Sequence, residues 1–257
     1  MKAWIFVVVN QKGGVGKTTT SVNTATALAR AGKRVLLVDL DPQGNATMGC
    51  GVDKRGLHRS VYQMLLGLEP PEAVRCRTDF GFDLLPANRD LAAAELELVD
   101  LPEREQRLKR AIAAMADRQD EVILIDCPPS LSMLTLNGLC AANGVIIPMQ
   151  CEYYALEGLS DLVNTIRKVQ TNFNPDLSML GLLRVMFDAR ITLAQQVSDQ
   201  LAEHFDEKVF KTVIPRNVRL AEAPSHGMPG LVFDPSSRGA KAYASFGDEL
   251  LARLAAA

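Results

Sequence analysis

The segment from Asn10 to Thr20 reads NQKGGVGKTTT and places three glycines among two lysines and three threonines. Glycines at positions 13, 14 and 16 let backbone N–H groups turn toward an anion without interference from Cβ atoms. Lys17 can place its charge on the β- and γ-phosphates of a nucleotide, and the Thr18 hydroxyl can ligate Mg²⁺. This combination of residues predicts a phosphate-binding loop.

Such a loop requires a buried strand before it and a helix after it, and the sequence contains both. The apolar run Trp4–Val9 precedes the loop, and the segment Lys17–Ala31, rich in Thr and Ala, follows it and ends before Gly32. The positive end of that helix would face the same anion. We expect nucleotide contacts along the whole loop, from Gln11, Lys12, Gly13, Gly14, Val15, Gly16, Lys17, Thr18 and Thr19.

The loop departs from the ordinary pattern G-x-x-x-x-G-K-[ST], which would place a glycine where this chain has Gln11. The actual pattern, K-G-G-x-G-K-T-T, contains a second lysine, Lys12. A second cation acting on the loop's own nucleotide would be partly redundant with Lys17. A lysine that crossed a dimer interface to the partner's nucleotide would not be redundant.

Three carboxylates follow two further apolar runs. Asp39 and Asp41 end the segment VDLDPQG, and because they are two positions apart they share one face of an extended chain. Asp126 ends the run VILID, which is typical of a buried strand that delivers one carboxylate to a metal shell. Strand ends on the side of the phosphate loop form the ligand crevice of such a sheet, where a carboxylate can orient water toward the γ-phosphate.

Apolar runs alternate with helical patterns along the chain, which predicts an α/β fold: a single-domain P-loop NTPase over residues 1–257, with helices on both faces of a twisted, mostly parallel sheet. The expected strands are Trp4–Val9, Arg34–Leu40, Phe82–Leu85, Val122–Asp126, Gly144–Met149, Met179–Phe187 and Val209–Ile214. Besides the helix after the loop, we expect helices within 101–115, 156–173, 192–205 and 238–254.

The charge, the apolar stretches and the cysteine spacing of the chain limit the classes of protein to which it can belong. A formal charge of −2 over 257 residues gives no global attraction to nucleic acid, so any such binding needs a local patch. No apolar stretch approaches the roughly 20 residues that span a bilayer, and the start of the chain lacks a secretion signal. The five cysteines form no C-x-x-C pair and are expected to be buried free thiols of a cytoplasmic protein.

The phosphate loop, D-x-D-P-Q and D-x-P-P together resemble the ParA family of chromosome and plasmid partition ATPases, in the deviant Walker A group. The resemblance extends from Val7 to about Tyr243 and includes QCEYYALEGL, LAQQV and IPRNVRLAEAPSHG. It implies ATP and Mg²⁺ as cofactors, slow hydrolysis, a homodimer formed with ATP, and a ParB-type partner that stimulates hydrolysis.

The resemblance also implies roles for individual residues. The catalytic set would be Lys12, Lys17 and Asp41, with Lys12 reaching the other subunit's ATP and Asp41 positioning water. Thr18 would bind the metal directly, Asp126 through water and Asp41 indirectly, with Asp39 as a support near Mg²⁺. Pro215 and Asn217 would contact the adenine.

Two relatives with the same loop remain as alternatives. An electron-transfer ATPase like the nitrogenase iron protein needs paired cysteines for an iron–sulfur cluster, and near the Asp126 motif this chain has only Cys127. A membrane-cycling ATPase of the MinD kind, which positions a division site, needs a basic amphipathic tail. Residues 249–257 do not form one, so stable membrane anchoring is not expected. Family members that position flagellar or chemotaxis machinery keep the same core and are a further alternative.

A partition ATPase needs a basic surface instead. Between Lys208 and Lys241 there are six basic and two acidic residues, a local charge of +4. We expect this region and the loop FDARITL to contact DNA, through Arg190, Arg219, Lys208, Lys211 and Arg238. Met228 stands where the family often has lysine, so one phosphate contact is expected to be missing. With no helix-turn-helix before the loop, binding would be non-specific and the protein associated with the nucleoid.

Overall fold

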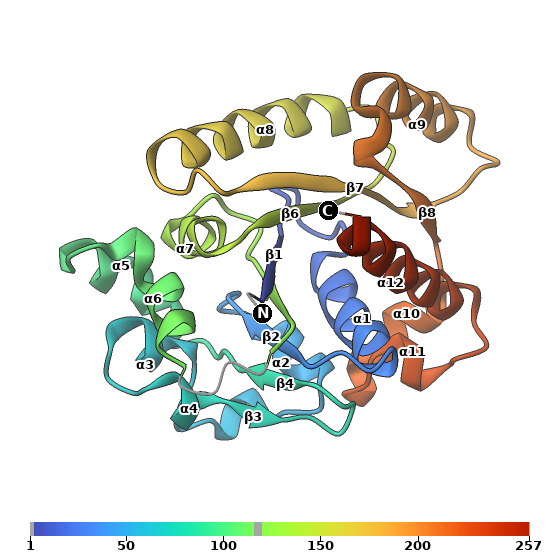
Figure 1. The fold of residues 1–257 in the computed structure, drawn as a ribbon. Coiled ribbons are helices and arrows are strands. Elements are labelled where there is room, and N and C mark those ends of the chain that lie inside the picture. The colour runs from blue at the N-terminus through green and yellow to red at the C-terminus, as the bar shows by residue number, and fades with distance from the viewer. Residues whose placement is uncertain (1–2, 116–119, 257) are drawn as a thin grey trace.

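An eight-stranded β-sheet forms the centre of the molecule in the computed structural model, which describes residues 3–115 and 120–256 (Figure 1). The strand order is β3-β4-β2-β5-β1-β6-β7-β8, and every neighbouring pair is parallel except β3 and β4. The strands are β1 (Trp4–Val8), β2 (Val35–Asp39), β3 (Cys76–Arg77), β4 (Asp83–Leu85), β5 (Val122–Asp126), β6 (Gly144–Met149), β7 (Ser178–Phe187) and β8 (Val209–Pro215).

Helices cover both faces of this sheet (Figure 1). One face packs against α3 (Val61–Leu66), α4 (Pro71–Val74), α5 (Leu91–Glu97), α6 (Arg107–Ala114), α7 (Met133–Ala141), α8 (Ala155–Asn172) and α9 (Thr192–Phe205). The other packs against α1 (Lys17–Arg30), α2 (Asn45–Gly49), α10 (Val218–Glu222), α11 (Gly230–Phe233) and α12 (Arg238–Ala256). Short 3-10 helices are η1 (Lys54–Gly56), η2 (Leu98–Asp100), η3 (Arg104–Gln106), η4 (Asp206–Lys208) and η5 (Ala223–His226).

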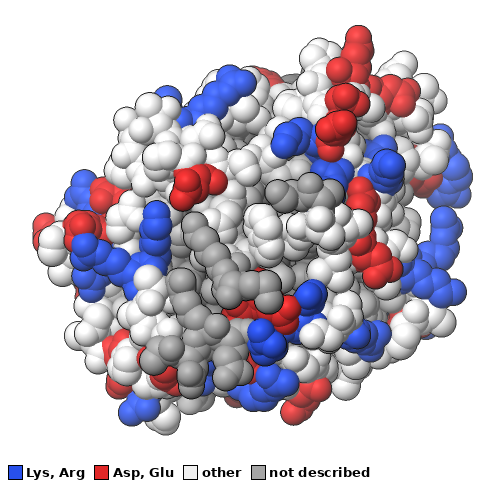
Figure 2. Space-filling model, in the orientation of Figure 1, with Lys and Arg blue, Asp and Glu red and all other residues white. Residues whose placement is uncertain are grey.

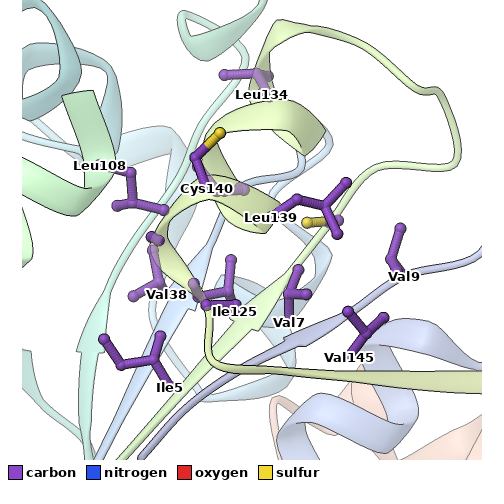
Figure 3. Packing of buried hydrophobic residues seen from close by; sticks show 14 of the residues in the cluster. Ile5, Val7, Val9, Val38, Leu108, Ile125, Leu134, Leu139, Cys140 and Val145 are labelled. Carbon is purple, nitrogen blue, oxygen red and sulfur yellow. The ribbon is translucent and has the colours of Figure 1, made fainter. Parts of the chain in front are cut away.

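Successive residues of the central strands pack into two different cores. Ile5 and Val7 of β1 belong to the core beneath α7, whereas Phe6 and Val8 belong to the core beneath α1 and α12. Figure 3 shows the first core from close by, with strand residues such as Val7 and Ile125 beneath Leu139 of α7. Because both sides of each strand are buried, its sequence reads as an unbroken apolar run, which is typical of parallel sheets.

The pairing register brings the functional loops to one edge of the sheet. Val8, the last residue of β1, pairs with Asp126, and Asp39, the last residue of β2, pairs with the same Asp126. The phosphate loop after β1 therefore lies beside the turn after β2, at the carboxyl ends of the central strands. Open α/β sheets bind their ligands at this edge.

The sequence-based fold prediction is confirmed. All seven predicted strands are present, each within one residue of its expected ends, and the sheet is mostly parallel. The eighth strand, β3, was not predicted because two residues are too few to show a pattern. The five cysteines are free thiols as expected, four of them buried and Cys76 half-buried.

Candidate nucleotide site and basic surface

The phosphate loop connects β1 to α1 and lines one side of an open cavity, called the phosphate cavity below. Gly14 and Gly16 adopt φ angles of +73° and +75°, a left-handed conformation that residues with a Cβ rarely adopt. No heavy atom lies within 4 Å of a Cβ built on Gly13 or Gly14, so the loop backbone faces open space. The cavity measures about 370 Å³ and is lined by Gly13, Gly14, Gly16, Lys17, Thr18, Thr19, Asp41, Gln43, Asn45, Pro129 and Met186. Val15 is buried in the protein, so only its backbone can serve a nucleotide.

Lys17 is the one cation among the residues that line this cavity in the described part of the chain. The residue is only 7% exposed, and Nζ donates a hydrogen bond of 3.1 Å to the carbonyl oxygen of Lys12. Burial lowers the pKa of Lys17, while the nearby carboxylates of Asp126 and Asp41 act in the opposite direction. A buried ammonium group at the start of a helix is suited to an anionic phosphate.

Asp126 accepts hydrogen bonds from two hydroxyl groups in the first turns of α1. Thr18 Oγ1 donates to Oδ2 at 2.7 Å, and Ser21 Oγ donates to Oδ1 at 2.8 Å. Burial, reinforced by the charge of Asp39, raises the pKa of Asp126 to about 8, although the two hydroxyl hydrogen bonds oppose the rise. A divalent cation at this position would favour the charged carboxylate, since opposite charge lowers a carboxyl pKa.

These residues fit a nucleotide-bound Mg²⁺ rather than a metal held by the protein alone. Among the described residues, no group of three or more His, Cys, Asp or Glu side chains could hold a metal ion. Mg²⁺ usually keeps several waters and takes one or two protein ligands together with substrate phosphates. The pair of Thr18 and Asp126, next to an open cavity lined by glycines, matches that pattern.

Asp39 and Asp41 lie in different surroundings although they are two positions apart. Asp39 is fully buried and accepts hydrogen bonds from the backbone and hydroxyl of Thr47, at 2.8 and 2.7 Å. Burial raises its pKa to about 6 despite these bonds. Asp41 is 8% exposed and lines the cavity, with Oδ1 accepting from the Gln43 N–H at 2.9 Å. Asp39 therefore stabilises the turn after β2 through its hydrogen bonds to Thr47, and Asp41 is the carboxylate that lines the phosphate cavity.

A second cavity, about 320 Å³ in volume, adjoins the first at Gly16, Thr19 and Met186. Pro215 and Asn217, the residues expected to contact adenine, line this second cavity at the end of β8. Asn217 also caps α10, because its side-chain oxygen accepts from the Leu220 N–H at 3.2 Å. Most of the predicted phosphate-binding residues and both predicted adenine-binding residues thus line two adjoining cavities.

Lys12 does not line the phosphate cavity. Its ammonium group forms an ion pair with the carboxylate of Glu152, which lies just before α8, and both side chains are about half exposed. The Lys12 backbone N–H donates to Asn10 Oδ1 at 3.0 Å, which fixes the start of the loop. The two lysines of the loop therefore point to different places, Lys17 inward and Lys12 to the molecular surface.

The sequence analysis missed several residues that surround these cavities. Ser21 lies one turn after Lys17 and shares Asp126 with Thr18, so its spacing on α1 could have revealed it. Met186 lines both cavities with a φ angle of +50°, which is unusual for a residue with a side chain, and no sequence signal marks it. Gln150 donates to the Gly14 carbonyl at 3.4 Å and ties the end of β6 to the loop.

Two of the three arginines expected to contact DNA, Arg190 and Arg219, are exposed and paired with acids. Arg190 donates to both carboxylate oxygens of Asp188, at 2.9 and 2.6 Å. Arg219 donates to Glu222 at 2.9 Å and lies 3.5 Å from the carboxylate of Asp234. The other expected residues, Lys208, Lys211 and Arg238, are exposed as well. On the face shown in Figure 2, basic and acidic side chains are interspersed.

Comparisons with known proteins identify the family. A family described as an AAA domain matches residues 3–179. The chain is 53% identical to the sporulation initiation inhibitor protein Soj of Bacillus subtilis, over 96% of this chain and 98% of that protein. It is 48% identical to the chromosome partitioning protein ParA of Myxococcus xanthus, over 97% and 88%. The chain belongs to the ParA/Soj family of partitioning ATPases.

Solved structures share the fold of this chain. One solved structure is that of a Mycobacterium smegmatis protein named cobyrinic acid a,c-diamide synthase, with bound ADP and magnesium. It is 45% identical to this chain, the match covers 97% of this chain and 94% of that one, and the TM-score is 0.85. The septum site-determining protein MinD of Pyrococcus horikoshii, complexed with Mg-ADP, has a TM-score of 0.77 at 24% identity over 97% and 96% of the chains. At that identity the MinD likeness shows a shared fold only.

All five cysteines lie in the described part of the chain and are free thiols. Within residues 3–115 and 120–256, no helix is both long and apolar enough to cross a bilayer.

Proposed function

We propose that this protein is an ATP-driven switch for DNA segregation. In this proposal an ATP-bound dimer binds DNA without sequence preference, and a ParB-type partner stimulates hydrolysis to release it. The single observation that supports this most strongly is the separation of the two loop lysines, one in the phosphate cavity and one on the surface. The names of relatives that are about half identical support the chromosome or plasmid partitioning role.

We assign ATP binding to the two adjoining cavities. Lys17 and the loop N–H groups would hold the phosphates, and Pro215 and Asn217 would contact the adenine. Mg²⁺, bound by the Thr18 hydroxyl and through water by Asp126, would neutralise charge on the transferred phosphate. Asp41 faces the phosphate space from the turn after β2, where its carboxylate can orient the attacking water.

Basal hydrolysis is expected to be slow because the phosphate cavity has no arginine among its described lining residues. An arginine that reaches the transferred phosphate accelerates such reactions by about 10³–10⁵. A partner protein that supplied or positioned the missing charge would therefore control the rate. In this proposal the protein is cytoplasmic and associates with the nucleoid. The partner stimulates hydrolysis locally, the protein leaves the DNA there, and the cargo attached to the partner moves.

DNA binding would be switched through dimerisation rather than through a change in the basic surface. The surface that we expect to contact DNA offers only a few exposed cations in each subunit, among them Arg190 and Arg219, so one subunit binds weakly and in a salt-dependent way. Joining two subunits places the second set of cations at a high effective concentration along the same DNA. ATP thus controls DNA affinity by controlling the number of linked subunits.

The experiment is a titration of the protein onto a DNA duplex with ATP, with ADP and without nucleotide, each at two salt concentrations. We expect strong binding only with ATP, and a steep loss of affinity at the higher salt concentration. Equal binding in all three states would contradict the switch. So would tight binding to one particular sequence.

A further inference from the structure

A separate cavity lies on the other side of the turn that carries Asp41. It measures about 550 Å³ and lies at the carboxyl ends of β2 and β4. Its lining residues are Pro42, Gln43, Lys54, Arg55, Leu57, Asn88, Arg89 and Asp90. Gln43 lines both this cavity and the phosphate cavity, so the turn 41–44 forms the wall between them.

The charges in this cavity favour an anionic ligand. Three cations, Lys54, Arg55 and Arg89, face one carboxylate, that of Asp90, which already accepts a hydrogen bond from the Asn88 amide at 3.0 Å. In the described part of the chain, neither Arg55 nor Arg89 forms an ion pair or a hydrogen bond through its guanidinium group. Two free guanidinium groups in one concavity are suited to phosphate oxygens, which they can bind in a bidentate manner.

Lys54 connects this cavity to the turn. Its ammonium group donates to the carbonyl oxygen of Gln43. A Cβ added at Gly44 would lie 2.9 Å from Lys54 Cδ and 2.6 Å from the carbonyl oxygen of Ala87. The turn therefore packs tightly between the segment that carries Lys54 and the segment that carries Ala87. The Gly44 and Gln43 N–H groups in turn donate to the backbone and side chain of Asp41. A change in the position of the Lys54 side chain would therefore alter the position of Asp41 through the turn 41–44.

We propose that this cavity is a second anion site, which binds a small molecule with two or more linked phosphate groups and thereby slows ATP hydrolysis. The volume falls within the range of about 300–1,000 Å³ that is typical of small-molecule pockets. Pro42 and Leu57 add apolar wall that a base or another organic group can cover. A concave site fits a compact oligophosphate better than a DNA duplex, whose backbone presents phosphates along a convex surface.

The effect on hydrolysis follows from the position of Lys54. An anion in the cavity competes with the Gln43 carbonyl for the Lys54 ammonium group. Loss of that hydrogen bond loosens the turn and with it the carboxylate of Asp41. Nucleotide binding through Lys17 and the loop is unaffected, so the ligand lowers the rate of hydrolysis at saturating ATP.

The test uses inorganic tripolyphosphate as the probe and calorimetry as the measurement. The full chain is first saturated with ADP and excess Mg²⁺, so that the phosphate loop is occupied and chelation by the probe does not deplete the metal. We expect one further equivalent of tripolyphosphate to bind. Arg55→Ala and Arg89→Ala should each weaken it about tenfold, the usual loss for one charge-assisted hydrogen-bonding group. Arg59→Ala is the matched control, because Arg59 pairs with Glu69 and lies outside the cavity.

Several outcomes would overturn the proposal. They are the absence of a second equivalent, an equal loss in Arg59→Ala, or weaker DNA binding in Arg55→Ala and Arg89→Ala without any tripolyphosphate site. Tripolyphosphate should also slow the ATPase of the parent but not of the Arg55→Ala/Arg89→Ala double variant. ATP-dependent DNA binding is measured separately, so failure of the segregation switch leaves the calorimetric result interpretable.

Discussion

The ammonium group of Lys12 is paired with the carboxylate of Glu152, which lies 140 positions further along the chain. This pair holds Lys12 against the start of α8 at the molecular surface, while Lys17 occupies the phosphate cavity. Two roles for Lys12 are compatible with that position. It can fasten the loop to α8 within one subunit, or it can leave Glu152 and reach the nucleotide of a second subunit.

Substitution of the two partners separates these roles. If Lys12 acts across an interface, Lys12→Ala should bind ATP but stay monomeric, whereas Glu152→Gln should dimerise with ATP as well as the parent or up to about fivefold more readily, since an exposed ion pair is weak. If Lys12 is an internal fastener, both variants should fail in the same way. Sedimentation with ATP and with ADP measures this, and a Lys12→Ala protein that dimerises normally rules out the intermolecular role.

Lys17→Ala has a different expected result, because Lys17 lines the cavity to which we assign the phosphates. Its loss should weaken nucleotide binding itself, so the variant should remain monomeric for lack of ATP rather than for lack of an interface contact. Equilibrium binding of a fluorescent ATP analogue distinguishes it from Lys12→Ala. Comparable ATP affinity in the two variants would contradict the assignment.

Asp41→Ala tests the carboxylate that faces the phosphate space. The variant should bind ATP and accumulate as the ATP-bound dimer, while hydrolysis falls by about a hundredfold or more, the usual contribution of a positioned general base. Phosphate release under single-turnover conditions is the measurement. Asp248→Ala, which removes an exposed carboxylate of α12, is the control. Hydrolysis at the parental rate in Asp41→Ala would show that another group orients the water.

The buried carboxyl groups of Asp126 and Asp39 predict a pH dependence of the metal-free protein. Their folded-state pKa values, raised to about 8 and about 6, exceed the ordinary carboxyl value. The folded protein therefore keeps protons that the unfolded chain has released, and stability should fall as the pH rises from about 5 to 8. Thermal unfolding in EDTA measures this. Asp126→Asn should flatten the slope, and Asp248→Asn should leave it unchanged.

Much of the site could be predicted because it depends on short, local patterns. The loop glycines, Lys17 and Thr18 lie within eleven residues of sequence, and Asp41 and Asp126 follow apolar runs whose ends meet at one edge of a parallel sheet. Pairing across the fold could not be predicted in the same way. Nothing in the sequence joins Lys12 to Glu152, since their contact depends on how β6 and α8 are placed relative to the loop.

Helix α7 shows a second limit of pattern-based prediction. Its sequence, MLTLNGLCA, is apolar on nearly every side and has no polar face, because the helix is buried between the sheet and its neighbouring helices. A helix that is hydrophobic all round has no 3.6-residue periodicity to detect. Its packing is visible in Figure 3, where Leu134, Leu139 and Cys140 lie over the strands.

The acidic partners of Arg190 and Arg219 lead to a prediction about DNA affinity. Asp188 holds Arg190 through two hydrogen bonds, which keep the pKa of Asp188 well below its usual range, and Glu222 holds Arg219. If these arginines contact DNA as proposed, a phosphate would have to displace the carboxylates first. Asp188→Asn and Glu222→Gln should therefore each raise the affinity of the ATP-bound protein for DNA by about two- to fivefold, because exposed ion pairs are weak.

Arg190→Glu and Arg219→Glu should do the opposite and abolish DNA retention while leaving ATP-dependent dimerisation intact. Titrations onto a DNA duplex at two salt concentrations measure all four variants. Asp199→Asn removes one negative charge from the exposed side of α9 without freeing an arginine, so it controls for net charge. If Asp199→Asn raised the affinity as much as Asp188→Asn, the gain would come from overall charge, and the carboxylates would have no specific masking role.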